Sequence, residues 1–497
     1  MSNHNINTKI SDFFKIASRT TTIKKEIIGG ILSFICMCYI LPVNAMILSS
    51  MGIDSNGVFA VTAIIGAFST ILMALLANYP VVLSSGMGLN AFLSYTICNQ
   101  IFSGPHSWQK SLIVLTISGI IFFIFSVTPL RRKFLDSIPK QIKVIISASL
   151  GIFICFVGLN NSGIIVSNPD TLVKFGELIK IAKVNSQTII NPTPLIALIG
   201  IFIIITLMFI KAKYKFLNTF AIPLTVIFLT IISIVCAYSG LDIYGSINEG
   251  VYNNGLLNFK DPSIWLPSGI KNVVFYGFLV ETDITFGELL IDVFSSPASY
   301  IAIFSLFMVN IFDTTSTLFS ITKEANLIDE NGKIINLRRA MIADSLGCLL
   351  SGPLGTSSVT SLAESAVGVS YGAKTGLSSL TAGVLMLCCV FLYPIFHFFT
   401  AFSITAPVLF AVGLTIFINN LKELDKNDFT ILISFTVSII FTLLSYSITK
   451  GIGISLIIYS LLYIFSKNRK DVPILVYIIT ILFLIDIILE EILHHLI

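Results

Sequence analysis

Two acidic residues, Asp313 and Glu364, lie in stretches that otherwise suit the interior of a lipid bilayer. Asp313 belongs to SLFMVNIFDTTSTLFSIT, and Glu364 belongs to SGPLGTSSVTSLAESAVGVSYG. A carboxylate at bilayer depth is costly, so it normally faces a partner, a water-filled cavity or a solute path. This pair is therefore the first candidate for a functional site.

The acid at position 313 has polar companions on the same helix face. Asn310, Asp313 and Thr317 are spaced i, i+3 and i+7, which places them on one side of a helix. A face this polar cannot be turned toward lipid. It either lines a site or forms a hydrogen-bonded zipper between helices.

Two Gly- and Ser-rich segments, 81–95 and 351–365, contain Asn90 and Glu364 respectively. Their sequences, SSGMGLN and SGPLGTSSVTS, disfavour continuous helix. Paired interruptions in two halves of a membrane protein indicate a transporter site near the bilayer midplane, where half-helix N-termini can meet a ligand. The alternative is close helix packing through small residues.

A third acid, Asp344, lies in RRAMIADSLGCLL near a predicted membrane edge. It either has a buried role or is a solvated helix cap. Burial disfavours an ionised carboxylate, so buried acids suit proton-coupled uptake. We expect no metal site, because the five histidines form no cluster in the apolar part of the chain. The sequence also has no phosphate-binding G-x-x-x-x-G-K-[ST] loop and no G-x-S-x-G nucleophile motif, so we expect neither a cofactor nor an enzyme.

The elements that must position these residues are membrane helices. The 497 residues are 55% hydrophobic and 11% charged, with a mean hydropathy of +0.93. Apolar runs of about 20 residues predict a polytopic α-helical membrane protein. The predicted spans are 28–50, 58–79, 81–100, 110–130, 140–159, 193–211, 218–239, 299–321, 338–352, 355–372, 376–398, 404–421, 428–447 and 450–466.

The charges predict the orientation of these spans. Basic residues gather in the N-terminal tail and around 131–143, 211–215, 323–339 and 467–470, which predicts a cytoplasmic N-terminus. Seven spans in each half give the second half the opposite orientation, as in an inverted repeat. Residues 150–164 and 411–424 resemble each other and lie fifth in their halves. The apolar segment 472–493 is extra and either spans or lies on the membrane.

The chain resembles the AzgA-like purine permeases, a branch of the nucleobase–cation symporters. The resemblance lies in GMGLNAFLSYT (86–96), FDTTSTL (312–318) and LGTSSVTSLAESAVGVSYGAKTGLSSLTAG (354–383), with TAPVLFAVG (405–413) and SYSITKGIGIS (445–455) in support. It implies an all-α, uracil-permease-like fold of 7+7 spans. Spans 1–4 and 8–11 would form a core domain, and spans 5–7 and 12–14 a gate domain against which the core moves.

In domain terms, the resemblance gives a cytoplasmic tail (1–26), core segments (27–130 and 299–398) and gate segments (131–239 and 399–466). An extracytoplasmic connection (240–298) and an extra C-terminal segment (467–497) complete the chain. The implied substrate-binding residues are Asn90, Asp313, Glu364, Gly88, Thr317, Thr360 and Ser365, and the implied proton-coupling residues are Asp313, Asp344 and Glu364. The sequence departs from the family at Ser316, where Gly is usual, and at Asn310, where an acid is frequent.

The resemblance implies secondary active uptake of purine nucleobases by proton symport across the cell membrane. An ionised Glu364 only accepts hydrogen bonds, which favours hypoxanthine and guanine, while a protonated one admits adenine. The expected partners are the purine, the proton and the bilayer, with a homodimer left open and no nucleic acid. The alternatives are a transporter of the same fold for uracil, xanthine or a small anion, a membrane-embedded transferase, and a channel.

Overall fold

The structure is a computed structural model of the chain. It describes all residues except 1–8, 10, 129–138, 169–170, 185–186, 210–219, 244–245, 249–250, 254–266, 268, 278–283, 328–333, 446–447, 466–471, 475, 482 and 486–497. Much of the basic sequence at 131–143 and 211–215, part of the connection 240–298 and part of the extra segment 472–493 therefore lie outside the described residues. The side chain of Ser316 also lies outside them.

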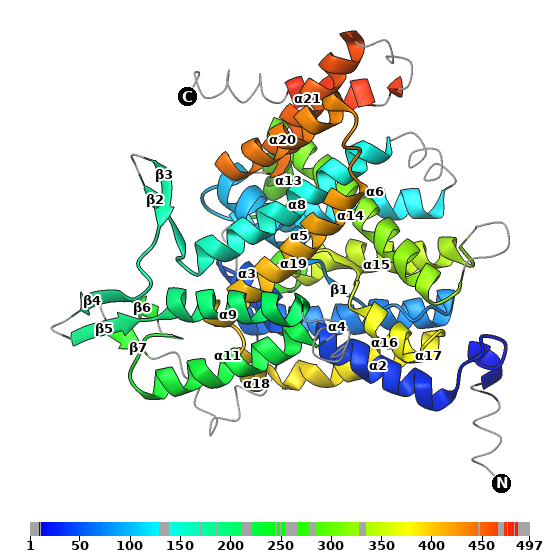
Figure 1. Cartoon of the computed structure of the whole chain (residues 1–497), viewed down its shortest axis with the longest axis horizontal. Helices are drawn as coiled ribbons and strands as arrows, with labels where there is room; N and C mark the ends of the chain where they lie inside the picture. Colours follow the sequence, from blue (N-terminus) through cyan, green and yellow to red (C-terminus); the bar gives the residue numbers. More distant parts are fainter. Residues whose placement is uncertain are drawn as a thin grey trace. The chain divides into compact units, whose positions relative to one another are not determined.

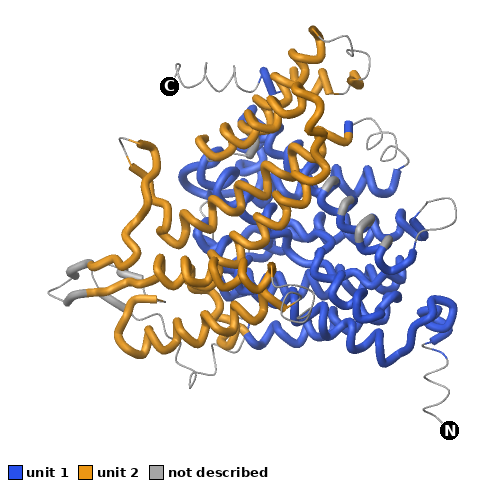
Figure 2. The backbone as a smooth tube through the Cα atoms, in the orientation of Figure 1, with its two compact units in different colours: residues 1–139, 267–392, 482–497 blue, residues 140–266, 393–481 orange. Residues whose placement is uncertain are grey.

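The chain divides into two compact units, each built from parts that are distant in the sequence (Figure 2). Unit 1 comprises residues 1–139, 267–392 and 482–497, and unit 2 comprises 140–266 and 393–481. Each unit thus combines a segment from the first half of the chain with one from the second half. The assignment of core and gate roles to such segments stays a prediction.

Unit 1 is built mainly of helices, several of which are interrupted (Figure 1). From the first half come α2 (Ile23–Met37), α3 (Ile40–Ser49), α4 (Ser55–Leu72), η1 (Met73–Ala77), β1 (Leu83–Ser85), α5 (Met87–Ala91), η2 (Phe92–Ile101) and α6 (Ser107–Val127). From the second half come α12 (Ile270–Val273), η5 (Val274–Gly277), α13 (Phe286–Ser295), α14 (Pro297–Glu324), α15 (Leu337–Leu354), β8 (Val359–Ser361), α16 (Ser365–Tyr371), α17 (Gly376–Cys388) and η6 (Cys389–Phe391).

Two short strands pair where the sequence predicted interruptions. β1 and β8 run antiparallel, with Ser84 opposite Thr360 in the register. Bonds from Leu362 N to Val82 O and from Gly86 N to Ser358 O, both 3.0 Å, extend the ladder at its two ends. All residues of both strands are buried, so this pairing satisfies backbone groups that have no helical partner. That these segments interrupt spans at bilayer depth stays a prediction.

The ends of the unit 1 helices follow from local sequence. Asp54 caps α4, because its side chain accepts hydrogen bonds from Asn56 N at 2.9 Å and Gly57 N at 3.4 Å. Gly355 ends α15 with φ +85°, a left-handed conformation that glycine adopts without strain. Gly355 thereby ends α15 a few residues before β8 begins at Val359.

The described part of the connection 240–298 contains the helix α13. Thr285 and Glu288 form a capping box, in which the Glu288 carboxylate accepts from Thr285 N at 2.8 Å and Thr285 Oγ1 donates to it at 2.9 Å. These hydrogen bonds, the backbone one foremost, lower the pKa of Glu288. The T-x-x-E signature was present in the sequence.

Unit 2 combines apolar helices with small β-hairpins. Its helices are α8 (Lys140–Asn161), α9 (Thr193–Phe209), α11 (Ala221–Tyr238), α18 (Tyr393–His397), α19 (Phe402–Glu423), α20 (Phe429–Leu444) and α21 (Ile448–Phe465). Its strands pair as β2 (Ile165–Asn168) with β3 (Leu172–Phe175), β4 (Lys180–Val184) with β5 (Gln187–Asn191), and β6 (Ser246–Asn248) with β7 (Val251–Asn253).

Helices α8 and α19 approach each other closely through glycines. A Cβ placed on Gly413 would lie 2.5 Å from Gly151 O, and one placed on Gly151 would lie 2.8 Å from Gly413 O. Small residues at such crossings let two helix backbones come together. The two segments that resemble each other in sequence, 150–164 and 411–424, thus belong to one packed helix pair.

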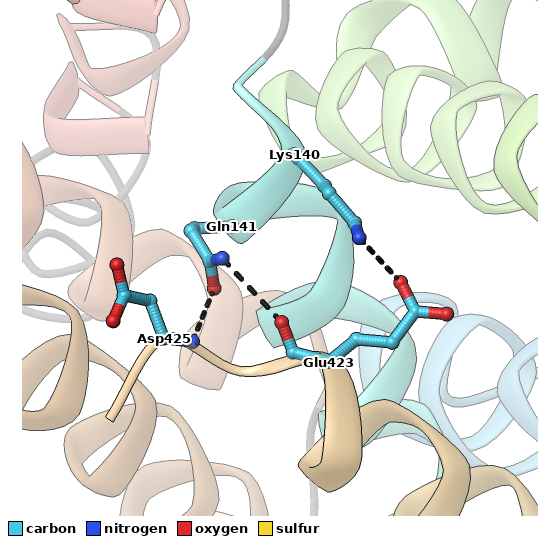
Figure 3. A network of polar contacts seen from close by, with 4 residues as sticks. All are labelled: Lys140, Gln141, Glu423 and Asp425. Carbon is cyan, nitrogen blue, oxygen red and sulfur yellow. Dashed lines mark hydrogen bonds and ion pairs between the residues drawn. The ribbon is translucent and has the colours of Figure 1, made fainter. Parts of the chain in front are cut away.

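A polar network joins the start of α8 to the end of α19 (Figure 3). Gln141 donates to Glu423 O at 3.4 Å and accepts from Asp425 N at 3.0 Å, while Lys140 pairs with the Glu423 carboxylate at 3.0 Å. Both ion-pair side chains are more than half exposed, so the pair contributes at most about 1 kcal/mol. The amide of Gln141 adds two hydrogen bonds at the same helix end.

Seven helices in the described part of the chain are long and apolar enough to cross a membrane. They cover Ile23–Ser49, Ser55–Ala77, Ser107–Val127, Lys140–Asn161, Ala221–Tyr238, Pro297–Thr315 and Phe402–Glu423. Shorter apolar helices cover Thr193–Phe209, Gly376–Phe391, Phe429–Leu444, Lys450–Phe465 and Val476–Ile485. The chain is a multi-pass membrane protein by the length and composition of these helices.

Candidate functional site

Two carboxylates of unit 1 are joined through the hydroxyl groups of neighbouring segments. Thr360 on β8 donates to Asp313 Oδ2 on α14 at 3.1 Å, and Thr314 on α14 donates to Asp344 Oδ2 on α15 at 2.6 Å. The hydroxyls of Thr314 and Thr360 lie 3.1 Å apart, and Ser361 donates to Asp344 Oδ1 at 2.9 Å. A chain of hydroxyls therefore connects the eighth-span acid to the ninth-span acid.

The alternative of a solvated cap is wrong for Asp344. Its side chain is completely buried, and both carboxylate oxygens accept hydrogen bonds from residues of other elements. The helix α15 begins seven residues earlier, at Leu337, so Asp344 lies inside it. Packing of α15 against α14 and β8 encloses a position that the sequence placed near a membrane edge.

Glu364 lies at the start of α16, directly after β8. Its Oε1 accepts a hydrogen bond of 2.7 Å from the phenol of Tyr39, at the junction of α2 and α3. Glu364 is half-buried, whereas the Tyr39 side chain is 3% exposed. A tyrosine hydroxyl that donates to a carboxylate holds that oxygen in place.

Asn44 on α3 is the centre of a second polar cluster. Its Oδ1 accepts from Ser85 at 2.7 Å, Ser357 at 2.9 Å and Asn90 at 3.1 Å. The cluster joins α3 to β1, to α5 and to the segment that precedes β8. The predicted amide Asn90 therefore has its position set by the first span rather than by its own segment alone.

The other predicted site residues have distinct surroundings. The Ser365 hydroxyl accepts from Val82 N at 2.9 Å and donates to Leu362 O at 2.7 Å, which ties α16 to the β1 segment. Gly88 is buried in α5, and Thr317 is half-buried on α14. Asn310 on α14 is buried and accepts from Ser358 at 2.7 Å. The substrate and coupling roles assigned to all these residues stay predictions.

Sequence reasoning missed Tyr39, Asn44, Thr314 and Ser361. Asn44 left a signal, because it interrupts the apolar run YILPVNAMIL with an amide that must find partners when buried. Thr314 also left a signal, because it lies four residues after Asn310 and three before Thr317, on the predicted polar face. Nothing in the local sequence links Tyr39 to Glu364.

A cavity of about 690 Å³ on unit 1 lies apart from these clusters. Its lining includes Lys15, Arg19, Arg339 and Lys374, and none of the predicted site residues. Arg19 donates to Lys374 O at 2.8 Å and to Asn78 O, and burial lowers the pKa of its guanidinium. The size of this cavity alone does not make it the functional site.

The described residues contain no group of three or more His, Cys, Asp or Glu side chains that could hold a metal ion. The acids at 313, 344 and 364 instead accept hydrogen bonds from hydroxyls. Carboxylates with such partners can exchange protons and bind N–H groups.

Comparison with known proteins identifies the family of the chain. A family model described as "Permease family" (Xan_ur_permease) matches residues 24–458. The guanine/hypoxanthine permease PbuG of Bacillus subtilis is 31% identical over 95% of this chain and 98% of that protein. The adenine permease AdeP of Escherichia coli is 31% identical over 96% of this chain and 95% of that protein.

Solved structures with the same fold include the transmembrane domain of a cyanobacterial bicarbonate transporter, BicA, with a TM-score of 0.57 and 16% identity. That likeness covers 87% of this chain and 96% of the BicA domain. The transporter SLC26A9 has a TM-score of 0.56, with 14% identity, over 89% of this chain and 66% of that chain. These likenesses confirm the predicted fold class, a helical transporter of 7+7 inverted repeats.

The relatives also confirm that the chain is a transporter and not an enzyme, because they are named permeases. The family model and these relatives cover nearly the whole chain, including the residues of both polar clusters. The chain therefore belongs to the Permease family of the Xan_ur_permease model, the nucleobase permeases, as its resemblance to the AzgA-like branch implied.

Proposed function

We propose that the protein takes up purine nucleobases across the cell membrane by proton symport, with its N-terminus in the cytoplasm. Relatives named guanine/hypoxanthine and adenine permeases support a purine over uracil, xanthine or a small anion. The clustering of basic residues in the expected inside loops supports the orientation.

The observation that carries the proposal is the way in which unit 1 holds its carboxylates. Thr360 donates to Asp313, Thr314 and Ser361 donate to Asp344, and Tyr39 donates to Glu364. Hydroxyl donors stabilise a carboxylate but leave its negative charge in place, and burial of that charge costs free energy. Binding of a proton neutralises the carboxylate and removes this cost. Protonation and substrate binding at such a site are therefore linked.

Within this proposal Glu364 forms a hydrogen bond with the edge of the purine that carries N1. One of its oxygens is occupied by Tyr39, and the other can accept from the N1–H of hypoxanthine or guanine. Adenine offers an unprotonated N1 there, so it requires a protonated Glu364. We expect hypoxanthine and guanine to be preferred and adenine to bind more weakly.

We further propose that Asp313 and Asp344 take part in proton coupling. Their shared hydroxyls, Thr314 and Thr360, give a proton on one acid a hydrogen-bonded route toward the other. Asn310 offers an amide at a position where the family frequently has an acid, so the coupling would rest on the three remaining acids.

Uptake of radiolabelled hypoxanthine in cells that lack purine transporters tests the proposal. Accumulation should exceed that of vector controls, collapse with a protonophore and be inhibited by unlabelled guanine. In proteoliposomes, a pH gradient that is acidic outside should drive accumulation. If no purine accumulates although the protein is present in the membrane, the purine assignment is wrong. If purine accumulates independently of the proton gradient, only the proposed proton coupling is wrong.

A further inference from the structure

Asn44 uses all of its hydrogen-bonding capacity within unit 1. Its Nδ2 donates to Thr62 Oγ1 and to Thr356 Oγ1, each at 2.9 Å. Its Oδ1 accepts from the hydroxyls of Ser85 and Ser357 as well as from the amide of Asn90. The residue is completely buried, so water is not a competing partner.

The orientation of the Asn44 amide follows from the hydroxyl of Thr62. That hydroxyl has a single proton, and it donates the proton to Val58 O at 2.6 Å. With its proton on Val58 O, it accepts from the Thr356 hydroxyl, 2.7 Å away, and from Asn44, which turns its nitrogen toward Thr62. The reverse orientation would set two oxygens against each other with no proton between them.

The hydrogen bond with Asn44 determines the orientation of the Asn90 amide. The oxygen of Asn44 faces Asn90, so Asn90 must present its Nδ2, which also lies 3.8 Å from the Met87 sulfur. Its Oδ1 is left without a hydrogen-bond partner although Asn90 is completely buried. Buried carbonyl oxygens are nearly always paired, so a ligand donor is the natural partner for this one.

We propose that Asn44 is a positioning residue that locks Asn90 with its carbonyl oxygen facing the substrate, as an acceptor for a purine N–H. This inference rests on the proposed function and adds the polarity of the contact. Glu364 takes the N1 edge in that proposal, so Asn90 takes the imidazole edge. The site then selects the ring tautomer whose N–H meets Asn90, and loss of that donor weakens binding about tenfold.

Two hypoxanthine analogues with fixed ring donors test this polarity. 7-Deazahypoxanthine has an N–H only at position 9 of its five-membered ring, and 9-deazahypoxanthine has one only at position 7. The measured quantity is the ratio of their inhibition constants against hypoxanthine uptake, which does not depend on expression. The wild-type protein should favour one analogue about tenfold, and Asn90→Leu should bring the ratio close to one.

Two substitutions at Asn44 separate positioning from general stability. Asn44→Leu removes the acceptor, so Asn90 can turn and the ratio should fall below about threefold. Asn44→Asp keeps an oxygen toward Asn90 and, in the protonated form that burial favours, an O–H toward Thr62, so it should retain the wild-type ratio. This second variant decides the matter if Asn44→Leu fails to reach the membrane. The matched control is Thr315→Val, which removes a hydroxyl bonded to Ile311 O within α14 and should leave the ratio unchanged.

A wild-type ratio near one would overturn the inference, and so would a ratio that Asn44→Leu leaves unchanged or Asn44→Asp abolishes. An equal collapse in Thr315→Val would show that the ratio follows general stability and would also overturn it. These outcomes differ from failure of the proposed function, in which the wild-type protein accumulates no purine at all.

Discussion

The phenol of Tyr39 donates a 2.7 Å hydrogen bond to Glu364 Oε1, although 325 residues of sequence separate the two. Tyr39 lies where α2 gives way to α3, and Glu364 lies where β8 gives way to α16. Two irregular points of the backbone, one in each half of the chain, thus meet at the acid expected to read the nucleobase. The contact fixes one oxygen of the Glu364 carboxylate.

Replacement of Tyr39 by Phe should lower kcat/KM for hypoxanthine uptake about tenfold to a hundredfold. A hydrogen bond to a charged group contributes about 1.5–3 kcal/mol, and without it Glu364 is both less ordered and less stabilised as an anion. Initial uptake rates at several hypoxanthine concentrations measure the change. Tyr276→Phe is the matched control. It removes a phenol hydroxyl that forms a 2.8 Å hydrogen bond with the hydroxyl of Thr116, and it should behave like the wild type.

Replacement of Glu364 by Gln should abolish most uptake, because an amide still accepts from Tyr39 but can neither ionise nor carry a proton. We expect a loss of at least about tenfold, since hydrogen bonds to a charged group are roughly twice as strong as neutral ones. Uptake in cells with matched surface expression is the measurement. Unchanged uptake would remove Glu364 from the binding site.

The neighbouring residues Thr314 and Thr315 offer a matched pair for the hydroxyl chain. Thr314→Val removes the donor to Asp344 and the contact with Thr360, so proton-driven uptake should fall about tenfold. Thr315→Val removes only a bond to Ile311 O in the same helix and should change uptake less than twofold. Uptake driven by an imposed pH gradient in proteoliposomes distinguishes the two. Equal effects would argue that α14 is merely destabilised.

The close crossing of α8 and α19 should not tolerate a methyl group on Gly413. Gly413→Ala would place its Cβ 2.5 Å from Gly151 O and 2.8 Å from Cys155 N, which are backbone atoms that cannot give way cheaply. We expect destabilisation of about 1–3 kcal/mol, seen as a lower melting temperature in detergent. Gly287→Ala on α13 meets no atom within 4 Å and should be neutral.

The capping box of α13 should weaken in acid. Hydrogen bonds from Thr285 lower the pKa of Glu288 in the folded protein, so the stabilisation is present at neutral pH and is lost as the pH falls through that lowered value. Amide hydrogen exchange of residues 286–290, corrected for the intrinsic rate, should therefore speed up at low pH. Glu288→Gln should show the faster exchange at neutral pH already and little further change in acid.

The sequence by itself determined the class of molecule and its candidate acids. Hydropathy, the basic loops and the motifs around Asn90, Asp313 and Glu364 depend on residues that are near one another in the chain, so they can be read without a fold. The same local signals predicted a polytopic transporter of 7+7 repeats, and the fold comparison confirmed that class.

Only the tertiary structure decided which partners the acids have. Asp344 lies near a predicted membrane edge, where a solvated cap was the alternative, yet the neighbouring segments α14 and β8 bond to it and it is completely buried. Tyr39 and Asn44 carried no motif, and their roles depend on contacts with Glu364 and Asn90 across the fold. A buried polar group takes its partners from whichever segments packing brings near, and no local pattern in the chain encodes that choice.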